Sequence, residues 1–177
     1  MGLTYTNLDD TSRRYMLEEI AFDVAHSDLY LGKRLTDTGR TRWLSLLNDA
    51  ASSHDDDWLA DQQRTEGLIK AKETRNLKGG KVIEVDVPIT AAETLAEGEF
   101  NRFYIRGLCR RAIDANIPSL LVYRAKDVAN PRSTSQDLIG TMVDAKTLLS
   151  DLRTHQGEEP QLKMPGGPNS GLSVRLP

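Results

Sequence analysis

The sequence predicts an α+β fold that is mainly helical: a helical N-terminal half, a small sheet packed on one long central helix, and an extended C-terminal tail. Apolar residues recur at helical spacing over much of the chain, two short apolar segments are bounded by turn residues, and the chain ends in a stretch rich in Gly, Pro and Ser. The predicted parts are a helical part at 1–69, a basic linker at 70–81, an α+β unit at 82–153 and the tail at 154–177.

The composition fits one domain with a hydrophobic core, because the chain has 177 residues of which 38% are hydrophobic. Its net charge of -3 argues against a general polyanion-binding protein, which is usually strongly basic. The start of the sequence has no signal-peptide pattern, and no apolar run approaches the roughly 20 residues that span a bilayer. We therefore expect a protein that is soluble and cytoplasmic when synthesised, without a membrane partner.

The first part of the chain is predicted to form three helices, at 11–26, at 39–52 and from about Asp56 onward. Their inward apolar positions are Met16, Leu17, Ile20, Ala21 and Val24 in the first, Trp43, Leu44, Leu47 and Ala51 in the second, and Trp58, Leu59 and Leu68 in the third. The acidic run at 54–57 is the cluster that most resembles metal ligands, but acids at a helix N-terminus are typical of capping. We predict no metal site there.

The middle of the chain changes character after residue 69. Residues 70–81 hold five basic residues, and Gly79 with Gly80 breaks any helix. Residues 82–87 alternate apolar and acidic side chains, which is typical of a half-buried strand. Further strands are predicted at 119–125 and 138–143, and Asp144 is predicted to cap a final helix whose inward residues are Ala145, Leu148, Leu149 and Leu152.

Residues 90–114 are predicted to form one long helix that carries an arginine stripe. Thr90 and Glu93 match a capping box at its start. Arg102, Arg106 and Arg110 recur every four residues and therefore share one face, which Arg111 widens. The opposite face is predicted to belong to the core and comprises Phe100, Phe103, Tyr104, Leu108 and Ala112.

Three interpretations of the arginine stripe stay open. The guanidinium groups can bind nucleic-acid phosphates, or they can pair with carboxylates of a neighbouring subunit. They can also form the solvated face of an amphipathic helix, with Glu99 paired to Arg102 and Asp114 paired to Arg110. If the stripe meets a partner, Arg106→Glu should disturb assembly or nucleic-acid binding more than folding.

The tail contains apolar side chains that suit docking on another surface. Leu172, Val174 and Leu176 are its main anchors, and residues 173–176 have the pattern of an added edge strand. We expect these anchors to dock on a neighbouring subunit.

Three segments resemble a family of small, uncharacterised proteins of phage, prophage and bacterial genomes. They are GEFNRFYIRGLCRRA at 98–112, PGGPNSGLSVRLP at 165–177 and HDDDWLA at 54–60. The resemblance implies a viral or mobile-element setting, and it implies no activity and no site residues.

The leading hypothesis is a non-enzymatic structural or assembly protein, a capsid or head-associated component of a bacteriophage virion, whose partners are copies of itself or other assembly proteins. The alternative is a nucleic-acid-binding accessory protein. The residues expected at the interface or on phosphates are Arg102, Arg106, Arg110, Arg111, Lys70, Lys72, Lys78 and Lys81. No catalytic residue and no cofactor is predicted, and Cys109 is expected to be a core residue.

Overall fold

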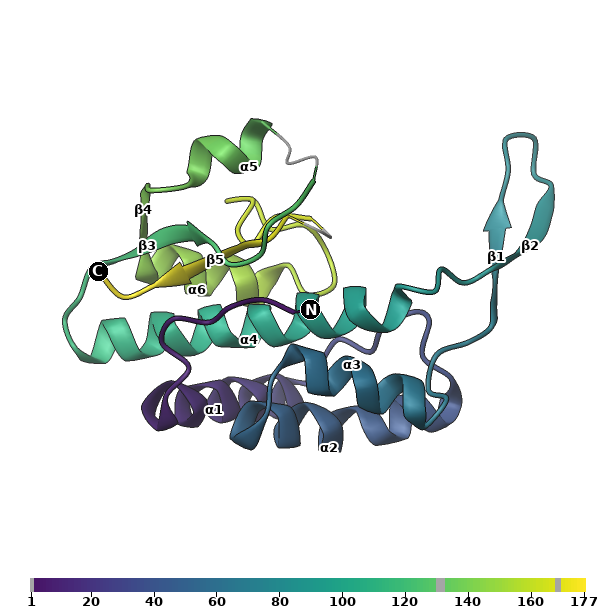
Figure 1. The fold of residues 1–177 in the computed structure, drawn as a ribbon, viewed down its shortest axis with the longest axis horizontal. Coiled ribbons are helices and arrows are strands. Elements are labelled where there is room, and N and C mark those ends of the chain that lie inside the picture. Colours follow the sequence, from purple (N-terminus) through teal and green to yellow (C-terminus); the bar gives the residue numbers. More distant parts are fainter. Residues whose placement is uncertain (1, 130–132, 168–169) are drawn as a thin grey trace.

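The computed structural model describes residues 2–129, 133–167 and 170–177. Its elements are α1 (Asp10–His26), α2 (Asp37–Ser53), α3 (Asp56–Thr65), β1 (Lys72–Asn76), β2 (Val82–Asp86), α4 (Ala91–Asp114), β3 (Ser119–Arg124), α5 (Ser133–Leu138), β4 (Met142–Asp144), α6 (Ala145–Thr154) and β5 (Leu172–Arg175). The long helix α4 runs through the middle, with α1, α2 and α3 on one side and the sheet and α6 on the other (Figure 1). This arrangement confirms the predicted α+β, mainly helical fold with a long central helix.

Side-chain caps begin most of the helices where the sequence predicts them. Each capping oxygen accepts a hydrogen bond from a backbone N–H three residues on: Asp9 from Ser12, Thr36 from Gly39, Asp55 from Trp58 and Asp144 from Thr147. The capping box predicted for α4 is wrong, because the Thr90 side chain makes no capping hydrogen bond. Glu93 instead forms an ion pair with Arg64 of α3.

Helix α4 is buried on nearly all sides because it lies between two layers. Its predicted core face is confirmed: all five residues of that face are at most 1% exposed. Gly107 allows α1 to approach closely, because a Cβ atom there would lie 3.0 Å from the backbone nitrogen of Met16. A helix enclosed in this way has no continuous solvent face for a charged stripe.

The tail joins the sheet of its own chain. Strand β3 is central and antiparallel to both β4 and β5, and Val122 lies opposite Val174 in the ladder with β5. The amide of Asn101 on α4 donates to the Leu172 carbonyl at 2.8 Å and accepts from the Ser173 hydroxyl at 2.7 Å. The expectation that Leu172 and Val174 dock on a neighbour is therefore wrong, since both are fully buried within this chain.

Two segments differ from their predictions in secondary structure. The basic linker contains β1, which pairs with β2 as an antiparallel hairpin that extends away from the body (Figure 1). The strand predicted at 138–143 is shorter and later, since α5 ends at Leu138 and β4 begins at Met142.

Candidate functional site

The arginine stripe of α4 lies partly inside the protein. Arg106 is completely buried, and Arg102 is 6% exposed. Arg110 and Arg111 lie nearer the surface and are half-buried, with side chains 32% and 25% exposed. The expectation that Arg102 and Arg106 contact a neighbouring subunit or phosphate is wrong, because their side chains are enclosed by α1, α6 and the segment after α6.

Arg106 binds two carboxylates of helix α1. Its Nε and Nη2 atoms donate to Glu19 Oε2 at 3.0 and 2.8 Å. Its Nη1 and Nη2 atoms donate to Asp23 Oδ2 and Oδ1 at 2.8 and 2.7 Å. The guanidinium carbon also lies 5.0 Å from the centre of the Phe103 ring. Both carboxylates are as buried as the arginine, so this is an ion cluster in the core.

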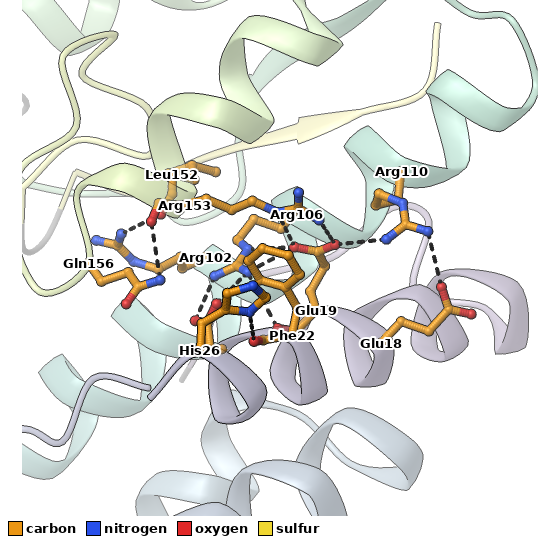
Figure 2. Close-up of polar contacts among 11 residues, drawn as sticks. Glu18, Glu19, Phe22, His26, Arg102, Arg106, Arg110, Leu152, Arg153 and Gln156 are labelled. Carbon is orange, nitrogen blue, oxygen red and sulfur yellow. Dashed lines mark hydrogen bonds and ion pairs between the residues drawn. The ribbon is translucent and has the colours of Figure 1, made fainter. Parts of the chain in front are cut away.

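Two further arginines complete the coordination of Glu19 (Figure 2). Arg153 of α6 donates to both carboxylate oxygens, and Arg110 donates to Oε1 at 3.1 Å. Burial by itself raises the pKa of Glu19, but the hydrogen bonds from Arg153 and the charge of Arg106 outweigh it, so the pKa is lowered. Glu19 is thus held as an anion that joins α1, α4 and α6.

Arg102 serves a different purpose, at the end of α6. Its Nη1 atom donates to the carbonyl oxygens of Leu152 and His155 at 3.3 and 2.6 Å, and its Nη2 atom donates to the Glu158 carbonyl at 3.1 Å. These carbonyls have no partner within the helix, and a cation near a helix C-terminus is favourable. Arg102 therefore fixes the point where the chain leaves α6 and enters the tail.

Asp9, the capping residue of α1, pairs with Arg111. The Nη1 atom of Arg111 lies 2.7 Å from Asp9 Oδ1 and also donates to the Ser12 hydroxyl.

Of the two ion pairs predicted within α4, the pairing of Glu99 with Arg102 is present at 3.7 Å. Asp114 does not pair with Arg110 as predicted, and accepts a 2.7 Å hydrogen bond from the Tyr15 hydroxyl.

The sequence reasoning missed the carboxylates that receive the stripe. Glu19 and Asp23 are four residues apart on α1 and lie on the same face as Met16 and Ile20, where they are buried. Val24, predicted to face inward, is 43% exposed. The signal was available: an acidic pair at helical spacing beside apolar residues complements an arginine stripe with the same four-residue spacing.

The four lysines of the predicted contact set lie on or beside the hairpin, and all four are exposed. Lys72 pairs with Glu84 across the two strands at 2.9 Å, and the Lys70 ammonium lies 3.4 Å from the Lys33 carbonyl. Lys78 and Lys81 flank the Gly79-Gly80 turn at the tip, and neither has an ion pair among the described residues. These lysines are the part of the predicted set that is open to a partner.

The other side chains that could take part in chemistry are buried in the core or have structural roles. Cys109 is completely buried, and burial raises the pKa of its thiol. Of the acidic run, Asp55 caps α3, and buried Asp56 accepts a 3.0 Å hydrogen bond from the Leu3 amide. Within the described ranges no cluster of three or more His, Cys, Asp or Glu side chains is arranged to hold a metal ion.

We compared the chain with protein-family models, curated proteins and solved structures. None of the three comparisons gives a match. In the described part of the chain, no helix is long and apolar enough to cross a membrane.

Proposed function

We propose that this chain is a non-enzymatic assembly protein and that the β1–β2 hairpin is the arm through which it contacts a partner protein. The observation that carries the proposal is the hairpin's position: it extends from the body without a core of its own (Figure 1). An isolated two-stranded hairpin is at best marginally stable in water. An arm of this kind gains most of its stability by packing on a partner protein.

The side chains of the arm suit a protein partner. Leu77 and Val82 near the tip of the arm are 45% and 58% exposed, although each would be favoured in an interior. Lys78 and Lys81 lie next to these two residues in the sequence. The outer edges of β1 and β2 also carry unpaired backbone groups, to which an extended segment of a partner can add as a further strand.

The root of the arm is fixed to the body, so the arm is presented in a defined direction. Arg34 Nε donates to Glu73 Oε2 at 2.7 Å, and the Lys70 amide donates to the Arg34 carbonyl at 2.8 Å. Hydrogen bonds from Arg34 and then Arg75 lower the pKa of Glu73 to about 2. A presented, charged and partly apolar arm is suited to repeated contacts between subunits.

The setting that we propose for this assembly is a bacteriophage virion, with copies of the chain or other virion proteins as partners. This part of the proposal is supported by the resemblance of residues 54–60, 98–112 and 165–177 to small phage and prophage proteins. The buried arginine stripe is compatible with it, because the ion cluster stabilises the subunit and leaves the arm to make the contacts.

Replacing the arm tests the proposal. Ala71 and Val87 are joined by a 2.9 Å backbone hydrogen bond, so a short Gly-Ser turn can replace residues 72–86. This replacement also removes Glu73, the ion-pair partner of Arg34. Size-exclusion chromatography with light scattering over a range of concentrations should show self-association or partner binding by the full chain and none by the shortened chain. A full chain that is monomeric and assembles with no virion protein would refute the proposal.

Nucleic-acid binding is the second candidate, and the two lysines without ion pairs at the hairpin tip favour it. Its test is retention of duplex and single-stranded DNA by the full chain, with affinity that falls steeply as salt rises. Lys78→Ala with Lys81→Ala should then weaken binding to all sequences alike. If no DNA is retained even at low salt, this candidate is refuted and the assembly proposal is unaffected.

A further inference from the structure

A cleft lies between the N-terminal half of α4 and residues 157–167 and 170–171 of the tail, beside the connection between α1 and α2. Its volume is about 500 Å³, within the range of sites that hold small ligands. Its charged lining residues are five acidic ones, Glu73, Glu97, Glu99, Glu158 and Glu159, and three basic ones, Lys33, Arg34 and Arg102. Glu97 is paired with Lys126, and Glu73 is paired with Arg34 and Arg75. The other three carboxylates, those of Glu99, Glu158 and Glu159, favour a positively charged ligand.

Glu99 contributes a nearly buried carboxylate to the lining. It is only 6% exposed, and its carboxylate accepts no hydrogen bond from any described residue. Its nearest charged partner is Arg102 Nε at 3.7 Å, which is too long for a hydrogen bond. Burial raises the pKa of Glu99 more than the charge of Arg102 lowers it. A donor that enters the cleft would satisfy this carboxylate.

Two of the three basic groups of the lining are already engaged. Arg34 is bound to Glu73, and both terminal nitrogens of Arg102 donate to backbone carbonyls around the end of α6. The third, Lys33, is exposed at the rim. The cleft therefore offers acceptors to a ligand and few donors. A carboxylate or phosphate ligand would find only Lys33 and the Nε atom of Arg102 as donors, whereas an ammonium group would find the buried carboxylate of Glu99.

Two glycines shape the cleft. Gly98 is exposed in the middle of α4, where a glycine disfavours a helix, and a Cβ atom there would meet no atom within 4 Å. Its small size thus serves no packing within the chain and leaves the wall open. At Gly157, whose φ is 69°, a Cβ atom would lie 2.3 Å from the Tyr30 ring, so this glycine lets the ring lie against the backbone and form part of the wall.

We propose that this cleft binds a primary ammonium group on a short alkyl chain, with Glu99 as the acceptor of its hydrogen bonds. The aromatic ring of Tyr30 and the apolar side chain of Leu95 line the same cleft and suit the alkyl chain and its cationic end. Both a free amine and a lysine side chain carry this chemistry. Glu73 at the root of the hairpin arm also lines the cleft, but the site does not depend on the function proposed above.

The test is a titration of the full chain with n-butylammonium, followed by amide NMR shifts and calorimetry, with n-butanol and n-butyrate as neutral and anionic controls of the same length. Only the ammonium should bind, with shifts centred on residues 97–99. Glu99→Gln should weaken binding about tenfold or more, since a hydrogen bond to a charged acceptor is lost. Glu18→Gln, which changes an exposed glutamate of α1 outside the cleft, is the matched control and should bind as the unchanged chain does.

A second variant keeps the proposal falsifiable if Glu99→Gln folds poorly. Gly98→Leu fills the open wall with a good helix former, so the melting temperature should hold or rise while n-butylammonium binding is lost. Equal binding of n-butylammonium and n-butanol, or equal binding by Glu99→Gln and Glu18→Gln, overturns the proposal.

n-Butylammonium also shows whether the ammonium group that binds the cleft belongs to a free amine or to a lysine side chain. If n-butylammonium dissociates a self-associated form of the chain, a lysine of a neighbouring copy occupies the cleft. If it binds without changing the oligomeric state, the ligand is a free amine.

Discussion

Arg106 on α4 and Glu19 on α1 meet through hydrogen bonds of 2.8 and 3.0 Å at a point where neither side chain is exposed to solvent. Charges so deeply buried persist only when their hydrogen bonds are satisfied. Asp23, Arg110 and Arg153 supply the remaining partners. The cluster thus specifies how α1, α4 and α6 fit together, and it turns a stripe that resembles a binding surface into part of the core.

Removal of Arg106 is therefore expected to unfold the protein more than it disturbs any partner. Arg106→Met leaves the Asp23 carboxylate buried without a described partner, which should lower the free energy of unfolding by about 3–5 kcal/mol. Urea denaturation followed by circular dichroism measures this loss. Adding Asp23→Leu to the same chain removes the unpaired charge and should restore about 2 kcal/mol or more.

Arg110→Met is the control for that experiment. The Arg110 side chain is 32% exposed, and ion pairs at such positions contribute about 1 kcal/mol or less. If Arg106→Met cost no more than Arg110→Met, the cluster would not be the structural element described here.

Much of this fold follows from the sequence, and the reasons for the failures are physical. Apolar spacing is a local feature and is sufficient to predict α1, α2, α3, α4 and α6, and Asp or Thr caps four of them. Helix α5 (Ser133–Leu138) has no such spacing and was not predicted. Strand β1 lacks such a signal, because Lys72–Asn76 contains no apolar residue and is a strand only through its pairing with β2. Local patterns do not reveal a strand that pairing alone creates.

The prediction that the arginine stripe meets a partner was wrong for a related reason. An arginine stripe has the same pattern on a helix that faces solvent and on a helix that faces an acidic neighbour. Here the neighbour is Glu19 with Asp23, some 80 to 90 residues earlier in the chain. The tail anchors were similarly recognised as docking residues, but the surface that receives them belongs to the same chain.

The buried carboxyl of Asp56 predicts a dependence of stability on pH. Asp56 is 1% exposed, and burial raises its pKa from 3.8 to about 6. The folded chain therefore holds this proton more tightly than the unfolded chain. The resulting stabilisation is present in full below about pH 4 and is lost as the pH rises through 6.

The variant Asp56→Asn isolates this contribution. Its amide oxygen can still accept the hydrogen bond from Leu3, and it carries no charge at any pH. Relative to the unchanged chain, its free energy of unfolding should increase between pH 4 and pH 7 by up to about 3 kcal/mol. Denaturation curves at several pH values measure the difference, and a difference that is flat across this range would contradict the account.

Two glycines of α4 should respond in opposite ways to the same substitution. Gly98→Ala adds a methyl group in open space and should raise the free energy of unfolding by about 0.5–1 kcal/mol through helix propensity. Gly107→Ala places a methyl group against Met16 and should lower it by about 1–3 kcal/mol. Thermal denaturation of the two variants side by side provides the comparison, and changes of the same sign would show that α1 and α4 are not packed as closely as described.

The attachment of the tail depends on Asn101. Asn101→Ala removes the partner of the Leu172 carbonyl and of the Ser173 hydroxyl, which should cost about 1–3 kcal/mol. Hydrogen–deuterium exchange of residues 172–175 should accelerate more than exchange in α2, which lies on the other side of α4 from the sheet (Figure 1). Uniform acceleration across the chain would instead indicate global destabilisation.

The central claim is that the hairpin arm, and not the arginine stripe, contacts the partner. Placing a photo-crosslinking amino acid at Val82 or at Arg110 tests it directly. Position 82 reports contacts made by the arm, and position 110 reports contacts made by the stripe. Irradiation at assembling concentrations should give a crosslinked product from position 82 and none from position 110. Crosslinking from position 110 alone would contradict the claim.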